Sequence, residues 1–343
     1  MPAPVISVIL PAYNASGTIG RAIESIQQQT FVDWELLVVD DGSSDGTASV
    51  AAEYCRRDQR IQLHCLGSNE GIVAALNLGI ERAEASLIAR MDADDASLPG
   101  RLAAQMALFV EDPGLGLVAT RVQFGGDASS SGGYAAYVAW TNSVCSPEEI
   151  SLQRFVESPF AHPSVMFRRE KVLELGGYRA GNFPEDYELW LRWLDSGVKM
   201  AKTPEVGLIW NDPVGRLSRS HDAYSVDAFY RVKAQYLSRW LQREVPPGRR
   251  IAIWGAGKTS RQRAGWLLAE GVNWQYWVDV NPRKIGQRIA GLPVLSVDEL
   301  LGFARAERPF VVSYVGSRGA GGRIRSILAE SGWSEGVDFL LAA

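Results

Sequence analysis

Residues 5–14, VISVILPAYN, and residues 35–47, ELLVVDDGSSDGT, each run from an apolar stretch into a polar turn. The apolar stretches are short and rich in β-branched side chains, which is typical of buried strands. The residues that follow them, 17–29 and 45–57, have the spacing of amphipathic helices. Strands that alternate with helices indicate parallel strands joined by crossover helices. The sequence therefore predicts an α/β fold with a mainly parallel sheet flanked by helices.

The same alternation continues through about the first 125 residues. Further strands are predicted at 61–65, 86–91 and 116–120, and further helices at 71–84 and 98–110. Gly, Ser and Asp then crowd residues 125–133, where we predict a flexible loop. Beyond the loop the pattern is less regular. It predicts helices at 147–157, 185–196 and 222–243, and strands at 164–167 and 206–210.

A second βα alternation starts after residues 245–248, VPPG, which form a rigid segment that stops a helix. The pattern predicts strands at 250–254, 274–280 and 311–315, and helices at 258–270 and 320–331. A length of 343 residues is more than one ordinary core needs. We therefore predict two domains, residues 1–244 and a small Rossmann-like α/β domain at residues 249–343.

Composition excludes several classes of protein. Apolar residues make up 46% of the chain, so packed cores are expected, and a net charge of −4 argues against nucleic acid as a partner. Cys55, Cys65 and Cys145 form no CxxC pair, which favours a reducing cytoplasm. The first residues lack the pattern of a secretory signal, and no stretch reaches the roughly 18 apolar residues that span a bilayer. Peripheral contact with the inner face of a membrane through helix 222–243 is left open, but we favour packing of this helix within its own domain.

Carboxylates gather where the predicted strands end. Asp40 and Asp41 follow the second strand, and Asp92 and Asp94 form a DxD motif after the fourth. The carboxyl ends of parallel strands meet at one edge of a sheet, where ligands bind. Carboxylates held close together repel unless a cation neutralises them, and oxygen donors favour Mg²⁺ or Mn²⁺. A divalent ion at this edge would suit a diphosphate, and a nucleoside diphosphate is the expected leaving group.

These motifs and their order resemble glycosyltransferase family 2, whose members have the GT-A fold. The resemblance covers residues 5 to about 242 and includes NEGIVAALNLGI at 69–80, LIARMDADDASLPGRL at 87–102, HPSVMFRR at 162–169 and PEDYELWLR at 184–192. It implies an inverting transferase that moves a sugar from a nucleotide sugar to an acceptor hydroxyl. The implied acceptor is a glycan or a lipid-linked sugar, and the implied setting is polysaccharide or glycoconjugate synthesis.

The resemblance also implies the site residues. The donor pocket is expected to comprise Pro11, Ala12, Tyr13, Asn14, Asp40 and Asp41. Asp40 is expected to bind the edge of the nucleotide base. Asp92 and Asp94 match the motif for the metal and the ribose-diphosphate. Asp186, in the acidic pair with Glu185, matches the catalytic base.

The position of the acidic pair supports this last assignment. Glu185 and Asp186 fall in the first turn of the helix predicted at 185–196. A helix N-terminus stabilises a carboxylate, so we expect Asp186 to be ionised and ready to accept a proton. Simple compensation of the helix dipole is the alternative interpretation of the same pattern.

Other side chains are weaker candidates. His221 resembles a late metal or diphosphate ligand, with Arg216 and Arg219 nearby, or else it is a solvated loop residue. His162 is expected to shape a turn or the acceptor pocket. Many relatives have an arginine where this chain has Leu76, so the polar contact of that arginine is expected either to be missing or to be supplied by Arg82 or Arg90.

The second domain carries a partial dinucleotide-binding fingerprint. Gly255 and Gly257 follow a predicted strand and open a helix, and Asp279 ends the next strand. Ser260 stands where the fingerprint has its third glycine. A structural or partner-binding module is the favoured interpretation, and a nucleotide-dependent oxidoreductase is an alternative, as is a non-catalytic nucleotide-sugar-binding protein. The donor sugar, the acceptor, the linkage and the oligomeric state do not follow from the residue types.

Overall fold

The computed structural model describes residues 3–126, 132–212 and 221–343. The chain folds into two compact units. The first comprises Met1–Ile150, Pro159–Gly181 and Glu185–His221, and the second comprises Ser151–Ser158, Asn182–Pro184 and Asp222–Ala343. The helix before the VPPG segment belongs to the second unit, whereas the sequence pattern put the boundary after it. The boundary at residues 244–249 stays a prediction about independently folding domains.

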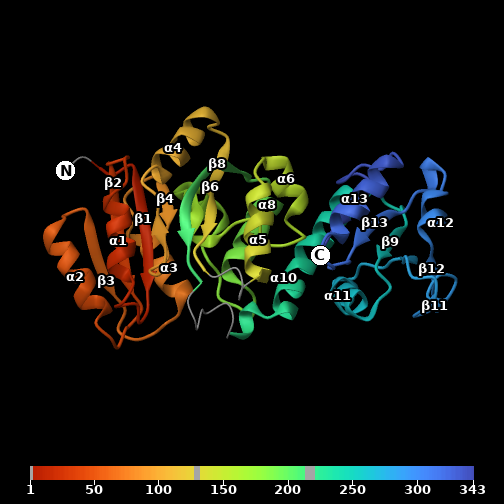
Figure 1. Ribbon diagram of the computed structural model, residues 1–343, viewed down its shortest axis with the longest axis horizontal. Coiled ribbons are helices and arrows are strands. Elements are labelled where there is room, and N and C mark those ends of the chain that lie inside the picture. The colour runs from red at the N-terminus through yellow and green to blue at the C-terminus, as the bar shows by residue number, and fades with distance from the viewer. Residues whose placement is uncertain (1–2, 127–131, 213–220) are drawn as a thin grey trace. The chain divides into compact units, whose positions relative to one another are not determined.

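The first unit is built on a mixed, mainly parallel sheet of eight strands in the order β3-β2-β1-β4-β7-β6-β8-β5 (Figure 1). Its strands are β1 (Ile6–Ala12), β2 (Trp34–Asp40), β3 (Ile61–Cys65), β4 (Leu87–Arg90), β5 (Ala96–Ser97), β6 (Leu115–Phe124), β7 (Val165–Arg168) and β8 (Lys199–Trp210). Strands β1 to β4 pair in parallel, while β7 is antiparallel to both β4 and β6. The predicted α/β sheet is confirmed.

Helices connect these strands in chain order. They are α1 (Ile19–Gln27), α2 (Thr47–Arg57), α3 (Ile72–Arg82), α4 (Arg101–Glu111), α5 (Gly132–Ser143), α6 (Pro147–Gln153), the 3₁₀ turn η1 (His162–Ser164), α7 (Arg169–Leu175) and α8 (Glu185–Asp195). The loop predicted at 125–133 lies partly outside the described residues, at 127–131, and α5 begins at its end. Helices α5 and α7 had no clear sequence signal.

The sheet of the first unit is buried on both faces. Ile6, Val8 and Leu10 of β1 pack into one hydrophobic cluster, and Ile9 between them packs into another. Successive side chains of a strand point to opposite faces, so a strand covered on both sides is apolar at every position. This explains why β1 is a continuous apolar run in the sequence.

The register of the parallel strands brings polar residues to one edge. Ala12 at the end of β1 lies opposite Asp40 at the end of β2, and Ile9 lies opposite Arg90 at the end of β4. The chain leaves β4 directly into the acidic segment at 92–95. The predicted convergence of acidic strand ends on one sheet edge is therefore present for Asp40 and the DxD segment.

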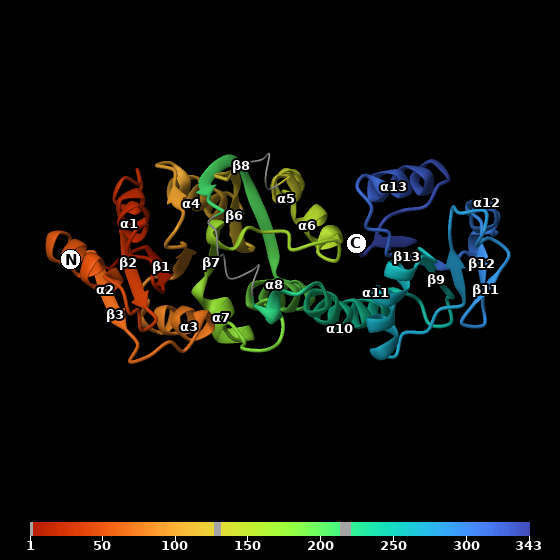
Figure 2. The same cartoon turned by 60° about the horizontal axis from the view of Figure 1, so that its bottom comes forward.

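The second unit contains a six-stranded sheet in the order β11-β12-β10-β9-β13-β14. Its elements are α10 (Val226–Glu244), β9 (Ile251–Trp254), α11 (Lys258–Ala269), β10 (Tyr276–Val278), β11 (Arg288–Ile289), β12 (Leu292–Leu295), α12 (Val297–Leu301), β13 (Phe310–Ser313), α13 (Ala320–Glu330) and β14 (Phe339–Leu341). Helices α11 and α13 cover opposite faces of the sheet (Figure 2), as right-handed crossovers in opposite directions require. This is the predicted Rossmann-like arrangement.

Helix α10 belongs to the second unit, although the sequence pattern placed it in the first domain. Its residues Tyr236, Leu237 and Trp240 are buried. Lys233 of the same helix is buried too, and its Nζ donates hydrogen bonds to the carbonyls of Val156 at 3.0 Å and Ala342 at 3.2 Å. Burial lowers the pKa of Lys233 to about 8. Within residues 3–126, 132–212 and 221–343, none of the helices combines the length and the apolar character that a bilayer span demands.

One glycine tests how tightly α3 packs on the sheet. A Cβ atom at Gly79 would lie 2.5 Å from Cγ2 of Ile9, a buried residue of β1. Gly79→Ala is expected to destabilise the protein by about 1–3 kcal/mol through overpacking, although alanine favours a helix by about 1 kcal/mol. Urea denaturation measures the change. Gly265→Ala in α11 is the control, because open space surrounds that position and only the stabilising propensity remains. Equal behaviour of the two variants would contradict the prediction.

Candidate active site

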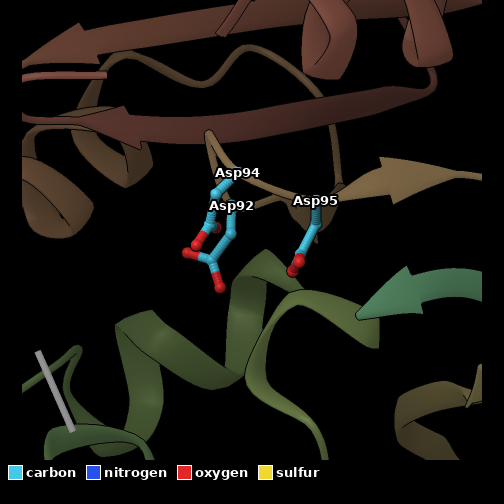
Figure 3. Close-up of side chains that lie close together, drawn as sticks. All are labelled: Asp92, Asp94 and Asp95. Atoms are coloured by element: carbon cyan, nitrogen blue, oxygen red, sulfur yellow. The ribbon is translucent and has the colours of Figure 1, made fainter. Parts of the chain in front are cut away.

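Three carboxylates form a tight cluster between β4 and β5. One oxygen from each of Asp92, Asp94 and Asp95 lies within 4.8 Å of the others (Figure 3). Asp92 and Asp94 are half-buried and Asp95 is buried. Hard oxygen donors at this spacing suit Mg²⁺ or Mn²⁺. The sequence predicted Asp92 and Asp94 as a pair, and the structure adds Asp95 to the cluster.

Two distant elements hold this acidic turn in place. Asp95 Oδ1 accepts a hydrogen bond from the backbone N–H of Asn211 at 2.8 Å, just after β8. The Asn211 amide and the Arg21 guanidinium both donate to the carbonyl of Asp94, at 2.7 and 2.8 Å. These hydrogen bonds fix the position of the turn through its backbone and through the carboxylate of Asp95. Asn211 carried no sequence signal, because its contact depends on the pairing of β5 with β8.

Arg90 lies at the end of β4, directly before the cluster. Its side chain is only 2% exposed and its Nη1 donates to Asp92 Oδ1. An ion pair between two such side chains reduces the repulsion among the three carboxylates. Arg90 was a candidate to replace the arginine missing at Leu76, and the structure shows it paired with Asp92.

The donor-pocket candidate Asp40 has an unusual environment. It is 3% exposed, and its Oδ2 accepts a hydrogen bond from the N–H of Ser43 at 3.1 Å. Its Oδ1 is buried and has no hydrogen-bond partner among the described residues. Burying an acceptor without a donor is costly, so this oxygen fits an N–H group of a bound ligand such as a nucleotide base.

Its neighbour Asp41 is fully engaged. Asp41 Oδ1 accepts from the N–H of Glu70 at 2.8 Å, and Oδ2 accepts from the N–H of Gly71 at 3.0 Å. These bonds tie the end of β2 to the start of α3. Both carboxylate oxygens of Asp41 are therefore occupied within the protein, and its place in the donor pocket stays a prediction.

The segment after β1 completes this side of the edge. Pro11 and Ala12 are buried in the strand, whereas Tyr13 is 49% exposed. Asn14 has a left-handed backbone, with φ of 49°, and its Oδ1 accepts from the N–H of Ser44 at 2.9 Å. The four predicted pocket residues therefore lie together at the end of β1, and Tyr13 offers an exposed ring on which a base can stack.

The predicted catalytic pair stands in the first turn of α8. Glu185 is buried, and the half-buried Asp186 accepts the N–H of Tyr187 at 2.7 Å. Burial and the adjacent Glu185 together raise the pKa of Asp186 to about 7. We expected the helix N-terminus to keep this carboxylate ionised. Desolvation and like-charge repulsion outweigh that effect, and the result is a group poised between its two protonation states near neutral pH.

His162 links this pair to a tyrosine that sequence patterns missed. His162 Nε2 lies 2.8 Å from the Tyr178 hydroxyl, and its Nδ1 lies 3.8 Å from Glu185 Oε1. Burial and nearby Arg90 lower the pKa of His162 well below its usual range, so the ring is neutral. Asn77 holds Tyr178 in place, because its amide donates to the Tyr178 carbonyl at 2.9 Å and accepts from the Tyr178 N–H at 3.0 Å.

The remaining candidates are less defined. His221 is exposed and is not a member of the acidic cluster, so its part in metal binding stays a prediction. Arg216 and Arg219 lie outside the described residues.

In the second unit, Asp279 and Ser260 of the predicted dinucleotide-binding fingerprint form hydrogen bonds within the protein. Asp279 Oδ2 accepts hydrogen bonds from the N–H of Ala256 at 3.0 Å and from Lys284 Nζ at 2.9 Å. The Ser260 hydroxyl donates to the carbonyl of Tyr314, and a Cβ at Gly255 would lie 2.7 Å from the Ser260 hydroxyl oxygen. These contacts join the loop that contains Gly257 to its neighbours. Nucleotide binding by Gly255 and Gly257 stays a prediction.

Comparisons with known proteins agree with this arrangement. Residues 7–176 match the family described as glycosyl transferase family 2, and residues 248–330 match the one described as CoA binding domain. The O-antigen biosynthesis glycosyltransferase WbnJ of Escherichia coli is 31% identical over 192 residues, which cover 56% of this chain and 72% of that protein.

Solved structures show the same fold. TarS 1-349 of S. aureus, in complex with UDP-GlcNAc, has a TM-score of 0.55 at 17% identity and covers 78% of this chain and 71% of its own. The mannosyltransferase PcManGT of Pyrobaculum calidifontis, in complex with GDP-Man and Mn²⁺, has a TM-score of 0.51 at 20% identity and covers 70% of this chain and 64% of its own. With its acidic sheet edge and its match to WbnJ, the chain belongs to glycosyltransferase family 2.

Proposed function

We propose that this glycosyltransferase is an inverting, metal-dependent enzyme that moves a sugar from a nucleoside diphosphate sugar to an acceptor hydroxyl. The observation that carries the proposal is the cluster of Asp92, Asp94 and Asp95 on the sheet edge where the buried Asp40 Oδ1 also lacks a hydrogen-bond partner within residues 3–126, 132–212 and 221–343. A base-binding acceptor and a cation-binding cluster on one edge suit a nucleotide diphosphate. The ligands named for the TarS and PcManGT structures support the same class of donor.

The residues present fit a divalent cation of the Mg²⁺ or Mn²⁺ type. Asp94 and Asp95 would hold the ion together with Asp92, whose second oxygen remains available beside Arg90. When bound, such an ion neutralises the diphosphate and makes it a better leaving group. Asp40 and Tyr13 would hold the nucleoside, and the tied loops around Asp41 and Asn14 would keep the pocket in shape.

Asp186 is the proposed general base. It takes the proton of the acceptor hydroxyl while the oxygen of that hydroxyl forms a bond to the anomeric carbon. The bond between that carbon and the diphosphate oxygen breaks in the same displacement, so the anomeric configuration inverts. The adjacent Glu185 helps to keep the pKa of Asp186 high. The neutral His162 lies beside Glu185 and contacts the hydroxyl of Tyr178.

The biological setting is part of the proposal. The relative WbnJ is an O-antigen biosynthesis glycosyltransferase, which supports polysaccharide or glycoconjugate synthesis for this chain. A glycan or lipid-linked acceptor would be met at the cytoplasmic face of a membrane, with the protein bound peripherally.

Substitution of Asp186 should lower turnover without changing the affinity for the donor. Asp186→Asn is expected to lower kcat by about 10²–10⁴-fold, because the acceptor hydroxyl loses its proton acceptor. Donor affinity, measured by calorimetry with Mn²⁺ present, is expected to stay near the wild-type value. Retention of full turnover would exclude Asp186 as the base, and donor binding without turnover in the wild type would favour a non-catalytic nucleotide-sugar-binding protein.

The pH profile should show the raised pKa of Asp186. We expect kcat/KM to fall below about pH 7, tenfold for each pH unit, because the protonated carboxyl cannot accept a proton. Glu185→Gln removes the adjacent negative charge, lowers the pKa of Asp186 and moves this acid limb down by about one pH unit. If Glu185 were itself the base, the same variant would lose turnover at every pH.

The acidic cluster should set the metal requirement. EDTA is expected to abolish turnover, and added Mn²⁺ is expected to restore it. Asp94→Asn should raise the Mn²⁺ concentration for half-maximal turnover by about tenfold or more. Asp112→Asn is the control, since Asp112 pairs with Lys199 outside the cluster. Turnover that persists in EDTA would contradict metal dependence.

A further inference from the structure

Tyr178, His162 and Glu185 form a series of buried polar contacts that ends beside the proposed base. The Tyr178 hydroxyl lies 2.8 Å from His162 Nε2, and His162 Nδ1 lies 3.8 Å from Glu185 Oε1. The three side chains come from the segment after α7, from η1 and from the first turn of α8, and all three are buried. Buried polar groups are costly unless they satisfy one another, so the orientation of each depends on its neighbour.

The backbone that carries Tyr178 is fixed from two helices. Asn77 of α3 forms two hydrogen bonds with the backbone of Tyr178 itself. Arg192 of α8 donates to the three preceding carbonyls, those of residues 175–177. A Cβ atom at Gly177 would lie 2.6 Å from Asn77 Oδ1, so the segment approaches Asn77 closely. The position of the phenol ring is therefore set by α3 and α8, independently of its contact with His162.

One position of the ring proton of His162 suits both of its neighbours. The ring is neutral, because burial lowers the pKa of His162 well below its usual range. A neutral imidazole has one N–H group and one lone pair. An ionised carboxylate accepts hydrogen bonds and donates none, so the proton belongs on Nδ1, which faces Glu185. Nε2 then accepts a hydrogen bond from the Tyr178 hydroxyl.

The contact with His162 distinguishes the two acids of the pair. At 3.8 Å it is longer than a hydrogen bond, and it acts through the dipole of the N–H group, which a nonpolar interior strengthens. Glu185 is buried on this side, whereas the neighbouring Asp186 is half-buried and its Oδ1 accepts from the N–H of Tyr187. Asp186 is therefore the more accessible of the two acids to an acceptor hydroxyl.

We propose that Tyr178 is a positioning residue, which acts through His162 to hold the Glu185 carboxylate in the interior and so leaves Asp186 as the base. This inference rests on the proposed function of Asp186. The Tyr178 hydroxyl donates to Nε2 and thereby keeps the proton on Nδ1, and the N–H at Nδ1 attracts Glu185 toward η1. The role requires no contact between Tyr178 and the substrate.

The position of the ring proton can be measured without turnover. Nitrogen-15 NMR of the full-length protein, labelled at histidine, distinguishes a protonated from an unprotonated ring nitrogen. The chain has three histidines, so loss of one signal in His162→Gln assigns that ring. In the wild type we expect the proton on Nδ1, although histidine in water favours Nε2. In Glu185→Gln the attraction of the carboxylate is lost, and the proton should move toward Nε2.

Kinetics test whether Tyr178 acts through Glu185. Tyr178→Phe should lower kcat by about tenfold at unchanged donor affinity, because a less firmly held Glu185 displaces the adjacent base. In a Glu185→Gln background the same substitution should change kcat by less than about twofold, since the group on which Tyr178 acts is then absent. Both comparisons are made well above the acid limb of the pH profile. Tyr314→Phe is the matched control, because Tyr314 is an equally buried tyrosine of the second unit. It should leave kcat and the His162 signals unchanged.

The outcomes separate this inference from the proposed function. An equal loss of kcat from Tyr178→Phe with and without Glu185→Gln would show that Tyr178 only packs, and would overturn the proposal. If Tyr178→Phe does not fold, the wild-type spectrum decides, because a proton on Nε2 of His162 overturns the proposal without any variant. A fully active Asp186→Asn would refute the assigned base, while the spectra would still show whether Tyr178 and Glu185 fix the ring of His162.

Discussion

Repulsion among neighbouring carboxylates is the constraint on which the site depends. Asp92, Asp94 and Asp95 sit within 4.8 Å of one another, Asp40 is buried on the same sheet edge, and Glu185 adjoins Asp186. Carboxylates so close together repel one another unless positive charge compensates them. Arg90 supplies part of it within the chain. A bound metal ion would supply further positive charge. The carboxylates that repel one another in the free protein are therefore the groups that favour binding of a cation.

The fold keeps this arrangement from relaxing. A sheet buried on both faces fixes the strand ends, and hydrogen bonds from Asn211 and Arg21 fix the acidic turn. Near Glu185 and Asp186, the side chain of Asn77 forms two hydrogen bonds with the backbone of Tyr178. The hydroxyl of Tyr178 contacts His162. Groups that would move apart if free are held by packing and by hydrogen bonds.

In the second unit, buried charged side chains have hydrogen-bond partners within the protein. Its fingerprint carboxylate, Asp279, is paired with Lys284 and with the N–H of Ala256. Lys233 is satisfied by two carbonyls, one from the segment before η1 and one from near the end of the described chain. The loops of this unit are thus held by internal hydrogen bonds, whereas the buried Asp40 Oδ1 of the first unit has no hydrogen-bond partner among the residues that the structure describes.

The sequence by itself determined the alternating elements, the acidic strand ends and the acidic pair at the start of α8, because apolar periodicity and strand-end motifs are local. Helices α5, α7 and α12 and the short strands β5, β11, β12 and β14 were not predicted, since most of them are too short to show a periodic pattern of apolar residues. Tertiary structure alone decided which polar groups became partners. Asp40 has a free buried oxygen while its neighbour Asp41 is fully hydrogen-bonded, and burial beside Glu185 raised the pKa of Asp186. Hydrogen bonding and desolvation depend on atoms far away in the chain, so residue type and spacing could identify the acidic groups but not their protonation.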